Sequence, residues 1–246
     1  MARRLLKETR LLLNSVPAVI VALFVASVIC MNLLANKSID LNVSWLALDG
    51  GIFFSWMAFL AMDIVTKRFG VKAANILSVF ALLVNLLVAL ILFAVSYVPG
   101  TWSQSYLEGS QGVINAALDG TVASTWYVIM GSSVAFIASA FVNNILNALI
   151  AKRFEKKNFL AFSVSSYAST LIGQFVDNML FAFIVSLNFF GWTAVQCVMC
   201  AVTGAIAELL LEVVFSPFGY RIVRRMERDE TGKAYLDFVA AGREEK

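Results

Sequence analysis

The stretch "LIGQFVDNMLFAFI" (171–184) is strongly hydrophobic, yet it carries a carboxylate and two amides near its centre. Asp177 is flanked by Gln174 and Asn178 among residues that suit the middle of a bilayer. Gln174 precedes Asp177 by three positions, so both side chains project from one face of a helix. Ionisable residues inside a membrane are rare and are functional candidates by default. The stretch therefore predicts a membrane helix with a polar face, which either lines a cavity or clamps another helix.

The composition of the whole chain extends this prediction. The 246 residues are 60% hydrophobic and 14% charged, with a mean hydropathy of +0.82. A soluble domain is nearer ~25% charged. The chain also contains apolar stretches long enough to cross a bilayer as helices, which predicts an all-α integral membrane protein. Its six expected spans are 16–35, 51–66, 73–98, 125–150, 159–190 and 192–215. The second is short, so we expect it to be re-entrant or broken.

The basic residues indicate which way the chain crosses the membrane. All but one of the 19 Lys and Arg residues fall in the N-terminus, in the connections after the second and fourth spans, or in the tail. Lys37 is the exception. Basic residues concentrate on the cytoplasmic side, so both termini are expected to be cytoplasmic. We divide the chain into a transmembrane domain (1–217) and a cytoplasmic tail (218–246). The first span is expected to remain uncleaved.

The outer loop and one internal sequence similarity also bear on the predicted architecture. The long outer loop (99–124) contains Glu108 and Asp119 but no basic residue, and it is either an interfacial helix or lid or an ordinary polar connection. "AFVNNILNALI" (140–150) matches "QFVDNMLFAFI" (174–184) at six of eleven positions. These segments lie in consecutive spans that cross in opposite directions, as in transporters with a binding site at the membrane midplane.

Four acids fall inside the expected spans. Asp177 is the deepest, and it is the first candidate for binding a solute. Asp63 lies near the cytoplasmic end of the second span, where the alternative to function is an interfacial pair with Lys67. Glu208 lies about two turns inside the last span, whereas Glu212 is expected to reach the interface near the tail arginines. Asp177 and Glu208 are also the candidates for carrying a coupling proton.

Amides and aromatic rings complete the candidate site. Asn143 and Asn144 give the fourth span a polar strip, and Asn32 lies in the first span. Amides both donate and accept hydrogen bonds, which suits a flat, uncharged, polar solute. Phe53 and Trp56 in the second span offer ring faces for stacking, although aromatic residues in a span are commonly packing residues.

Several other classes of function are not supported. The chain has no His, which removes histidine bases and histidine metal ligands, and we expect no metal or cofactor. It has no P-loop, so it does not itself bind ATP in that way. A two-aspartate membrane protease using Asp63 and Asp177 lacks the expected Gly-x-Gly-Asp context. Cys30, Cys197 and Cys200 lie in apolar runs and suit packing. The basic residues follow topology, so no nucleic acid is expected.

Three motifs resemble the queuosine-precursor transporter family, also called the vitamin uptake transporter family. They are "MNLLANK" (31–37), "GGIFFSWMAFLAMDIVTKRFG" (50–70) and "SSYASTLIGQFVDNMLFAFI" (165–184). The resemblance extends from the first to the sixth span. It implies a six-helix bundle in the bacterial inner membrane that imports 7-deazaguanines. It also supports functional roles for Asn32, Lys37, Asp63, Gln174 and Asp177.

Two departures from the family pattern bear on the substrate. Many members have an acid where this chain has Lys67, and often a Gln and an Asp where it has Ala140 and Asn143. The nitrile form, the aminomethyl form and the free base queuine all remain open as substrates. We expect Asp177 to accept from the N1–H and 2-amino edge of the solute, and Gln174 or Asn144 to donate to O6.

Energy coupling and assembly are open at this level. The expected function is a substrate-specific importer that is not an enzyme. The alternatives are a membrane subunit that needs a separate ATP-driven energising module, or an intramembrane enzyme. Ala18, Ala22 and Ala26 recur every four residues, a spacing that permits close helix approach. The approaching helix belongs either to this chain or to another subunit.

Overall fold

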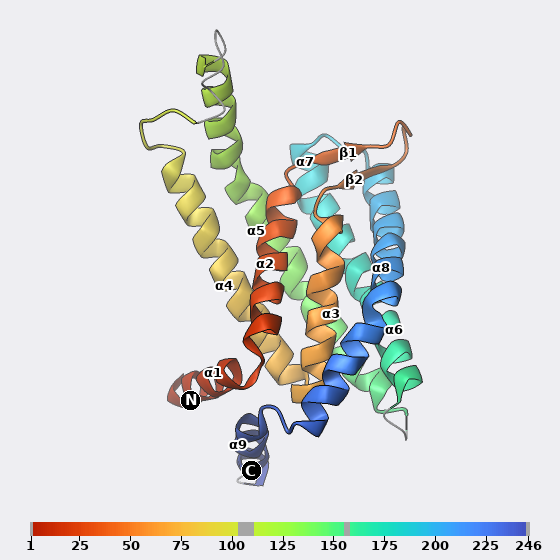
Figure 1. The fold of residues 1–246 in the computed structure, drawn as a ribbon. Coiled ribbons are helices and arrows are strands. Elements are labelled where there is room, and N and C mark those ends of the chain that lie inside the picture. The colour runs from red at the N-terminus through yellow and green to blue at the C-terminus, as the bar shows by residue number, and fades with distance from the viewer. Residues whose placement is uncertain (1, 103–110, 155–157, 245–246) are drawn as a thin grey trace.

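The computed structural model describes residues 2–102, 111–154 and 158–244, and helices dominate them. Figure 1 shows long helices that run side by side, with a small two-stranded hairpin at one end. The helices and strands, in chain order, are α1 (Ala2–Ser15), α2 (Ala18–Leu34), β1 (Ser38–Asp40), β2 (Ala47–Asp49), α3 (Ile52–Phe69), α4 (Val71–Val95), α5 (Gln111–Ala151), α6 (Phe159–Phe181), the π-helical η2 (Ala182–Ser186), α7 (Leu187–Phe189), α8 (Ala194–Arg228) and α9 (Lys233–Glu244).

Local sequence explains where the main helices begin and end. Asn158 caps α6, its side chain accepting from the backbone N–H of Ala161 at 2.9 Å. Thr193 and Gln196 form a reciprocal capping box at the start of α8. Gly70 ends α3 and precedes α4 with φ of 90°, a conformation that a glycine adopts without a steric penalty. α3 and α4 are thereby joined by a single residue.

Four helices of the described chain are long and apolar enough to cross a membrane: α4, α5, the α6–α7 stretch and α8. The bent pair α1–α2, which turns by 106° near Pro17, makes a fifth. α3 is 18 residues long and contains Asp63, Lys67 and Arg68, so hydropathy alone does not single it out. It is one continuous helix, and the break expected in the second span is absent. Six spans thus remain a prediction, whereas a multi-pass membrane protein is established.

α3 occupies the centre of the bundle. Every residue from Ala58 to Thr66 is buried, and α3 packs against α2, α4, α5 and α8. Buried apolar side chains on both sides of Asp63, such as Phe59 and Val65, belong to the main hydrophobic core. A helix enclosed by protein can carry charged side chains that would be costly against lipid.

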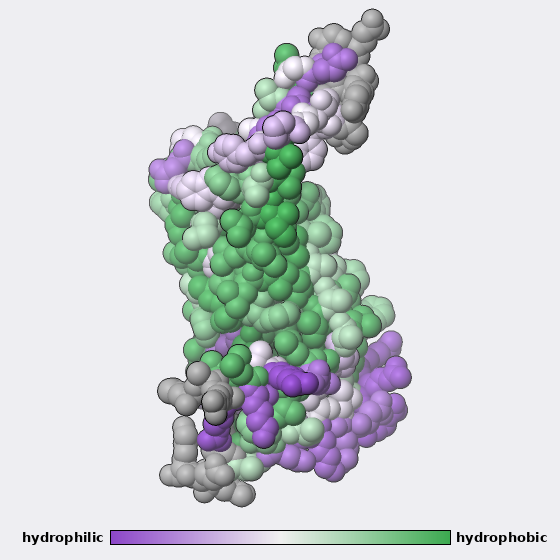
Figure 2. Space-filling model, turned by 90° about the vertical axis from the view of Figure 1, so that its left-hand side faces the viewer, coloured by the Kyte–Doolittle hydropathy of each residue, from purple (hydrophilic) through white to green (hydrophobic). Residues whose placement is uncertain are grey.

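The two ends of the molecule differ in charge. α1 and α9, the first and last helices, lie at the same end, opposite the hairpin (Figure 1). Figure 2 shows a broad hydrophobic belt, with hydrophilic side chains gathered below it at that end. Placing both ends of the chain on one side agrees with the predicted topology, and the cytoplasmic assignment stays a prediction.

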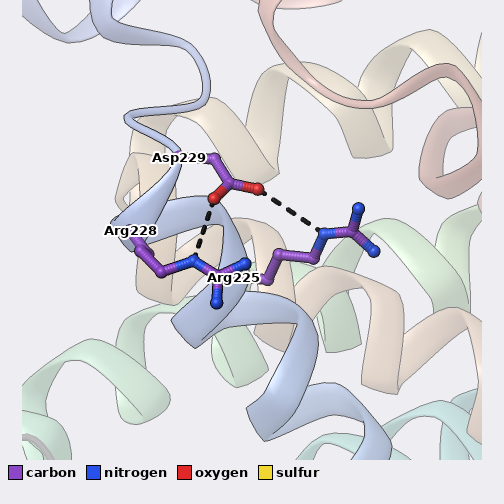
Figure 3. A network of polar contacts seen from close by, with 3 residues as sticks. All are labelled: Arg225, Arg228 and Asp229. Atoms are coloured by element: carbon purple, nitrogen blue, oxygen red, sulfur yellow. Dashed lines mark hydrogen bonds and ion pairs between the residues drawn. The ribbon is translucent and has the colours of Figure 1, made fainter.

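The turn after α8 is held by charged side chains. Asp229 accepts from Arg228 Nε at 3.1 Å and lies 3.5 Å from Arg225 Nε (Figure 3). The bond from Arg228 lowers the pKa of Asp229. Arg68 of α3 donates to the backbone carbonyl of Thr231 at 2.7 and 3.1 Å. The tail is therefore attached to the helical bundle and does not form a separate unit.

Only part of the expected outer loop (99–124) lies within the described residues. Residues 103–110, including Glu108, lie outside the described residues. Residues 111–124 form the first part of α5, which at about 1.5 Å per residue is much longer than the hydrocarbon core and projects beyond the other helices (Figure 1). Trp102 Nε1 donates to Asp119 at 2.7 Å. This segment is therefore a helical extension of α5.

Candidate functional site

Two polar clusters lie inside the bundle, one above the other. We name the first the Asp177 cluster, which comprises Ser55, Ser139, Gln174, Asp177, Asn178 and Glu208. We name the second the Asp63 cluster, which comprises Asp63, Lys67, Asn143, Asn147, Ser166 and Glu212. Their members come from α3, α5, α6 and α8, four helices that are packed together.

The Asp177 cluster joins α3, α5, α6 and α8. Ser139 Oγ donates to Asp177 Oδ1 at 2.7 Å. Glu208 accepts from Asn178 Nδ2 at 3.1 Å and from the hydroxyl of Ser55. Asp177 and Glu208 also interact electrostatically. Two carboxyl groups from different helices therefore face one polar region.

Gln174 is the unsatisfied member of this cluster. Its side chain is fully buried, and neither its Nε2 nor its Oε1 has a hydrogen-bond partner among the described residues. Asp177, one turn further along α6, retains 8% exposure. Buried polar groups are normally paired. An unpaired amide beside a buried carboxylate is therefore an arrangement suited to a ligand.

The Asp63 cluster lies nearer the end that carries α1 and α9. Asn143 Nδ2 donates to Asp63 Oδ1 at 2.9 Å. Ser166 Oγ contacts both Asp63 Oδ2 and Glu212 Oε1, the latter at 2.8 Å. Glu212 is fully buried. The expectation that it reaches the interface was wrong, because its position on α8 directs it to α6 and α3.

Lys67 closes the Asp63 cluster on one side. Its Nζ donates to Asn147 Oδ1 at 2.7 Å and to Ser165 Oγ at 2.6 Å. It interacts electrostatically with Asp63 and Glu212, and it lies 4.8 Å from the centre of the Phe162 ring. Lys67 therefore belongs to the polar interior and does not form the interfacial pair with Asp63 that was considered.

Small residues allow the clusters to form. A Cβ atom on Gly204 would lie 2.7 Å from Asn178 Nδ2, and one on Gly173 would lie 2.8 Å from the Phe59 ring. Real Cβ contacts are not that short, so a larger residue would displace the Asn178 amide at the first position and the Phe59 ring at the second. Phe59 lies on α3 between Ser55 and Asp63, spaced by four residues on each side, so its ring stands between the two clusters.

A cavity of about 220 Å³ opens at the end of the bundle that carries α1 and α9. Lys67, Asn147 and Ser165 line its inner part, and Tyr220 and Arg224 of α8 also line it. Asn147 and Lys67 belong to the Asp63 cluster as well. The cavity therefore connects this end of the molecule with two polar partners of the buried acids.

At the opposite end, Asp49 of the hairpin lies near the Asp177 cluster. Asp49 is 8% exposed and accepts from the backbone N–H of Gly51 at 2.7 Å. Burial raises the pKa of Asp49 to about 6, against the lowering effect of the Gly51 bond. Asp49 interacts electrostatically with both Asp177 and Glu208. Charged and polar groups thus continue from one end of the bundle to the other.

The remaining predicted site residues lie apart from these two clusters. Asn32 of α2 accepts from the hydroxyl of Ser132. Asn144 accepts from Thr66 Oγ1 at 3.1 Å and donates to Asn75 at 2.7 Å. Trp56 stacks on Phe215, with ring centres 4.4 Å apart. Phe53 is 63% exposed, and Lys37 is exposed after α2.

Sequence reasoning missed the hydroxyl partners of the acids. Ser139 precedes Asn143 by four residues, and Ser55 precedes Asp63 by eight, so helical spacing places each on a polar face. That signal was present but weak, because serine is common in membrane helices and bonds equally well to its own backbone. Ser165 does so here with Ala161 O at 2.6 Å.

Several helices that are long and apolar enough to cross a membrane enclose a buried, partly unsatisfied polar interior, an arrangement typical of a multi-pass membrane protein of the transporter class. A family model described as "Putative vitamin uptake transporter" matches residues 49–222. The match covers more than half of the chain, and the chain belongs to the vitamin uptake transporter family. Searches of curated proteins and of solved structures returned no significant match.

Proposed function

We propose that this chain imports a queuosine precursor, a 7-deazaguanine, across a bacterial inner membrane. The candidates are the 7-cyano form, the 7-aminomethyl form and queuine. Membership of the vitamin uptake transporter family supports import of a small organic solute. The choice of a deazaguanine rests on the chemistry of the Asp177 cluster.

The observation that carries this proposal is the pairing of Asp177 with the unpartnered Gln174 on one face of α6. Ser139 occupies one oxygen of Asp177, and the carboxylate can accept from the N1–H and 2-amino groups of a guanine-like edge. The Gln174 amide, which has no protein partner among the described residues, can donate to O6. Asn144 is the weaker alternative, because Thr66 and Asn75 already occupy its amide.

The polar clusters also support a route through the bundle. The cavity at one end reaches the Asp63 cluster, the Phe59 ring stands between the clusters, and Asp49 lies beyond the Asp177 cluster. A central site reached alternately from either side is the general arrangement of transporters. The cavity at the end carrying α1 and α9 corresponds to a state open toward the predicted cytoplasm.

The direct test is solute binding to the purified protein, followed by uptake into proteoliposomes. The panel contains guanine, the cyano and aminomethyl deazaguanines, and queuine. Asp177→Asn should weaken binding at least about tenfold, because its amide nitrogen would oppose a donor of the solute, a mispairing of buried groups. Asp237→Asn on the exposed face of α9 is the matched control. Wild-type affinity in Asp177→Asn would reject the assignment.

One observation keeps the energising module as a second candidate. Ala18, Ala22 and Ala26 are all exposed on α2, beside Val19 and Leu23, so no helix of the described chain covers that face. Reconstitution distinguishes the two cases, because uptake by the isolated chain excludes an obligatory ATP-driven partner.

A further inference from the structure

Asp63 and Glu212 share one hydroxyl group in the core of the bundle. Ser166 Oγ is within hydrogen-bonding distance of Asp63 Oδ2 and lies 2.8 Å from Glu212 Oε1. The three side chains come from α3, α6 and α8, and the exposure of each is zero. The solute face described above does not use this group.

The number of hydrogens in this arrangement is informative. A serine hydroxyl has one hydrogen to donate, and an ionised carboxylate can only accept. Ser166 can therefore donate to one of the two carboxyl groups but not to both. The second contact is a hydrogen bond only if the other carboxyl group is protonated and donates to Ser166 Oγ. The geometry thus accounts for one proton held between Asp63 and Glu212.

The surroundings indicate which acid holds that proton. Asp63 Oδ1 accepts from Asn143 at 2.9 Å. Lys67 interacts electrostatically with both acids, and more strongly with Asp63 than with Glu212. Glu212 Oε2, by contrast, has no hydrogen bond of normal geometry among the described residues, although the Thr170 hydroxyl interacts with this carboxyl group. A buried charge without partners is strongly unfavourable. Asp63 is therefore the ionised member and Glu212 the protonated one.

A proton can reach this group from the cavity. Asn147 lines the cavity and lies next to Asp63. Its side chain is fully buried, and its Nδ2 has no hydrogen-bond partner among the described residues, so it can donate to a water molecule that carries the proton. The titratable groups facing the pair are Lys67 of α3 and the two acids themselves. α5 and α6 contribute the amides Asn143 and Asn147 and the hydroxyl of Ser166.

We propose that Asp63, Ser166 and Glu212 form a proton-binding site that exchanges with the cavity at Lys67. Resting on the proposed transport function, this site couples import to proton movement at a place separate from the solute face. It places coupling at a pair of acids different from Asp177 and Glu208, which the sequence had nominated. Asp177 and Glu208 accept hydrogen bonds from hydroxyl and amide groups and are not needed for proton binding, so both can bind the solute.

Infrared spectroscopy of the purified protein tests the site without any solute. A protonated carboxyl group has a C=O band that shifts on exchange into D₂O. Glu212→Gln should remove the part of this C=O band that comes from protonated Glu212. Ser166→Ala should shift the frequency of that part, because the hydrogen bond to Oγ is lost. Glu227→Gln on the same helix, where Glu227 pairs with Arg224 at 2.8 Å, is the matched control and should leave the component in place.

Two results would overturn the proposal. One is a spectrum in which neither Glu212→Gln nor Ser166→Ala changes the protonated component. The other is a wild-type band that responds to added sodium at constant pH, which would identify a sodium site instead. Ser166→Ala retains both acids. If Glu212→Gln does not fold, the infrared spectrum of Ser166→Ala alone tests the proton site.

Coupling is then measured as proton flux accompanying uptake into proteoliposomes. Glu212→Gln should bind the solute with wild-type affinity while losing the dependence of uptake on an imposed pH gradient. Unchanged pH dependence in that variant would refute the coupling role. Because the infrared result requires no solute, an error in the proposed substrate would leave the proton site supported, and the two failures are distinguishable.

Discussion

Ser139 and Asp177 face each other across the contact between α5 and α6, with Ser139 Oγ donating to Asp177 Oδ1 at 2.7 Å. The hydroxyl occupies one lone pair of Oδ1, which leaves Oδ2 and the second lone pair of Oδ1 for a ligand. Ser139→Ala should therefore weaken solute binding about five- to thirtyfold, equivalent to ~1–2 kcal/mol, since a hydrogen bond to a charged group is lost. Ser133→Ala in the same helix removes a buried hydroxyl without a partner among the described residues and should leave the affinity unchanged. Equal affinities in all three proteins would contradict this role.

The unpartnered amide of Gln174 should oppose stability while serving binding. A buried polar group without a hydrogen bond costs about 1–3 kcal/mol. Gln174→Met, which has a similar size and no hydrogen-bond donor, should raise the thermal unfolding midpoint in detergent and abolish uptake. Both quantities are measured on the same preparation. A variant with unchanged stability and full uptake would show that the amide neither strains the fold nor binds the solute.

Gly173 is required by the close approach of α3 and α5 to α6. A Cβ atom there would lie 2.8 Å from Phe59 Cε1 and 3.0 Å from Asn143 Cβ. Gly173→Ala should destabilise the protein by about 1–3 kcal/mol through overpacking. At Gly120 of α5 nothing lies within 4 Å, so Gly120→Ala should be neutral or stabilising. Thermal unfolding compares the two, and equal midpoints would refute the packing argument.

Asp49 should make stability depend on pH at the hairpin end. Burial raises its pKa to about 6 from an ordinary value of 3.8, so the folded protein binds the proton more tightly than the unfolded chain. The stabilising contribution is therefore complete below pH 4 and is lost as the pH rises through 6. Asp49→Asn keeps an acceptor for Gly51 and removes this contribution. The gain in unfolding midpoint of the variant over wild type should grow from pH 4 to pH 7, and a constant difference would argue against it.

Arg68 should hold the tail against α3. Its guanidinium donates twice to the carbonyl of Thr231, and charge-assisted bonds of this kind contribute about 1.5–3 kcal/mol. Arg68→Ala should accelerate hydrogen exchange in α9 about tenfold or more. Arg225→Ala is the control, because Arg225 is 78% exposed and lies 3.5 Å from Asp229, and exposed pairs contribute about 0–1 kcal/mol. Similar exchange in both variants would mean that the Thr231 contact does not anchor the tail.

Much of the architecture was predictable because hydropathy and charge are properties of local composition. The expected span 159–190 closely matches the helical stretch that begins at Phe159 and ends at Phe189. Its π-helical turn was not predictable, since it depends on contacts from other elements. Tyr127 of α5 donates to the Ile184 carbonyl at 2.9 Å there, and Cys197 Sγ lies 3.4 Å from the Ala182 carbonyl.

The contacts between side chains in the candidate site were less predictable than the identity of the residues that form it. Asp63, Asp177 and Glu208 were nominated because a carboxylate in an apolar stretch is conspicuous. Glu212 was assigned to the interface, and an interfacial pair of Lys67 with Asp63 was considered, because sequence position suggests depth. Burial depends instead on what surrounds the helix. α3 is enclosed by other helices, so Lys67 meets Asn147 and Ser165 before it reaches bulk water.

By itself, the sequence determined that this chain is a multi-pass helical membrane protein with acids at unusual depth, because the bilayer selects for apolar length and excludes unpaired charge. Only the tertiary structure decided that Ser139 faces Asp177 and that Ser166 lies between Asp63 and Glu212. The rotation and packing of four helices determine such contacts, and no property of one helix specifies which face of another it will meet.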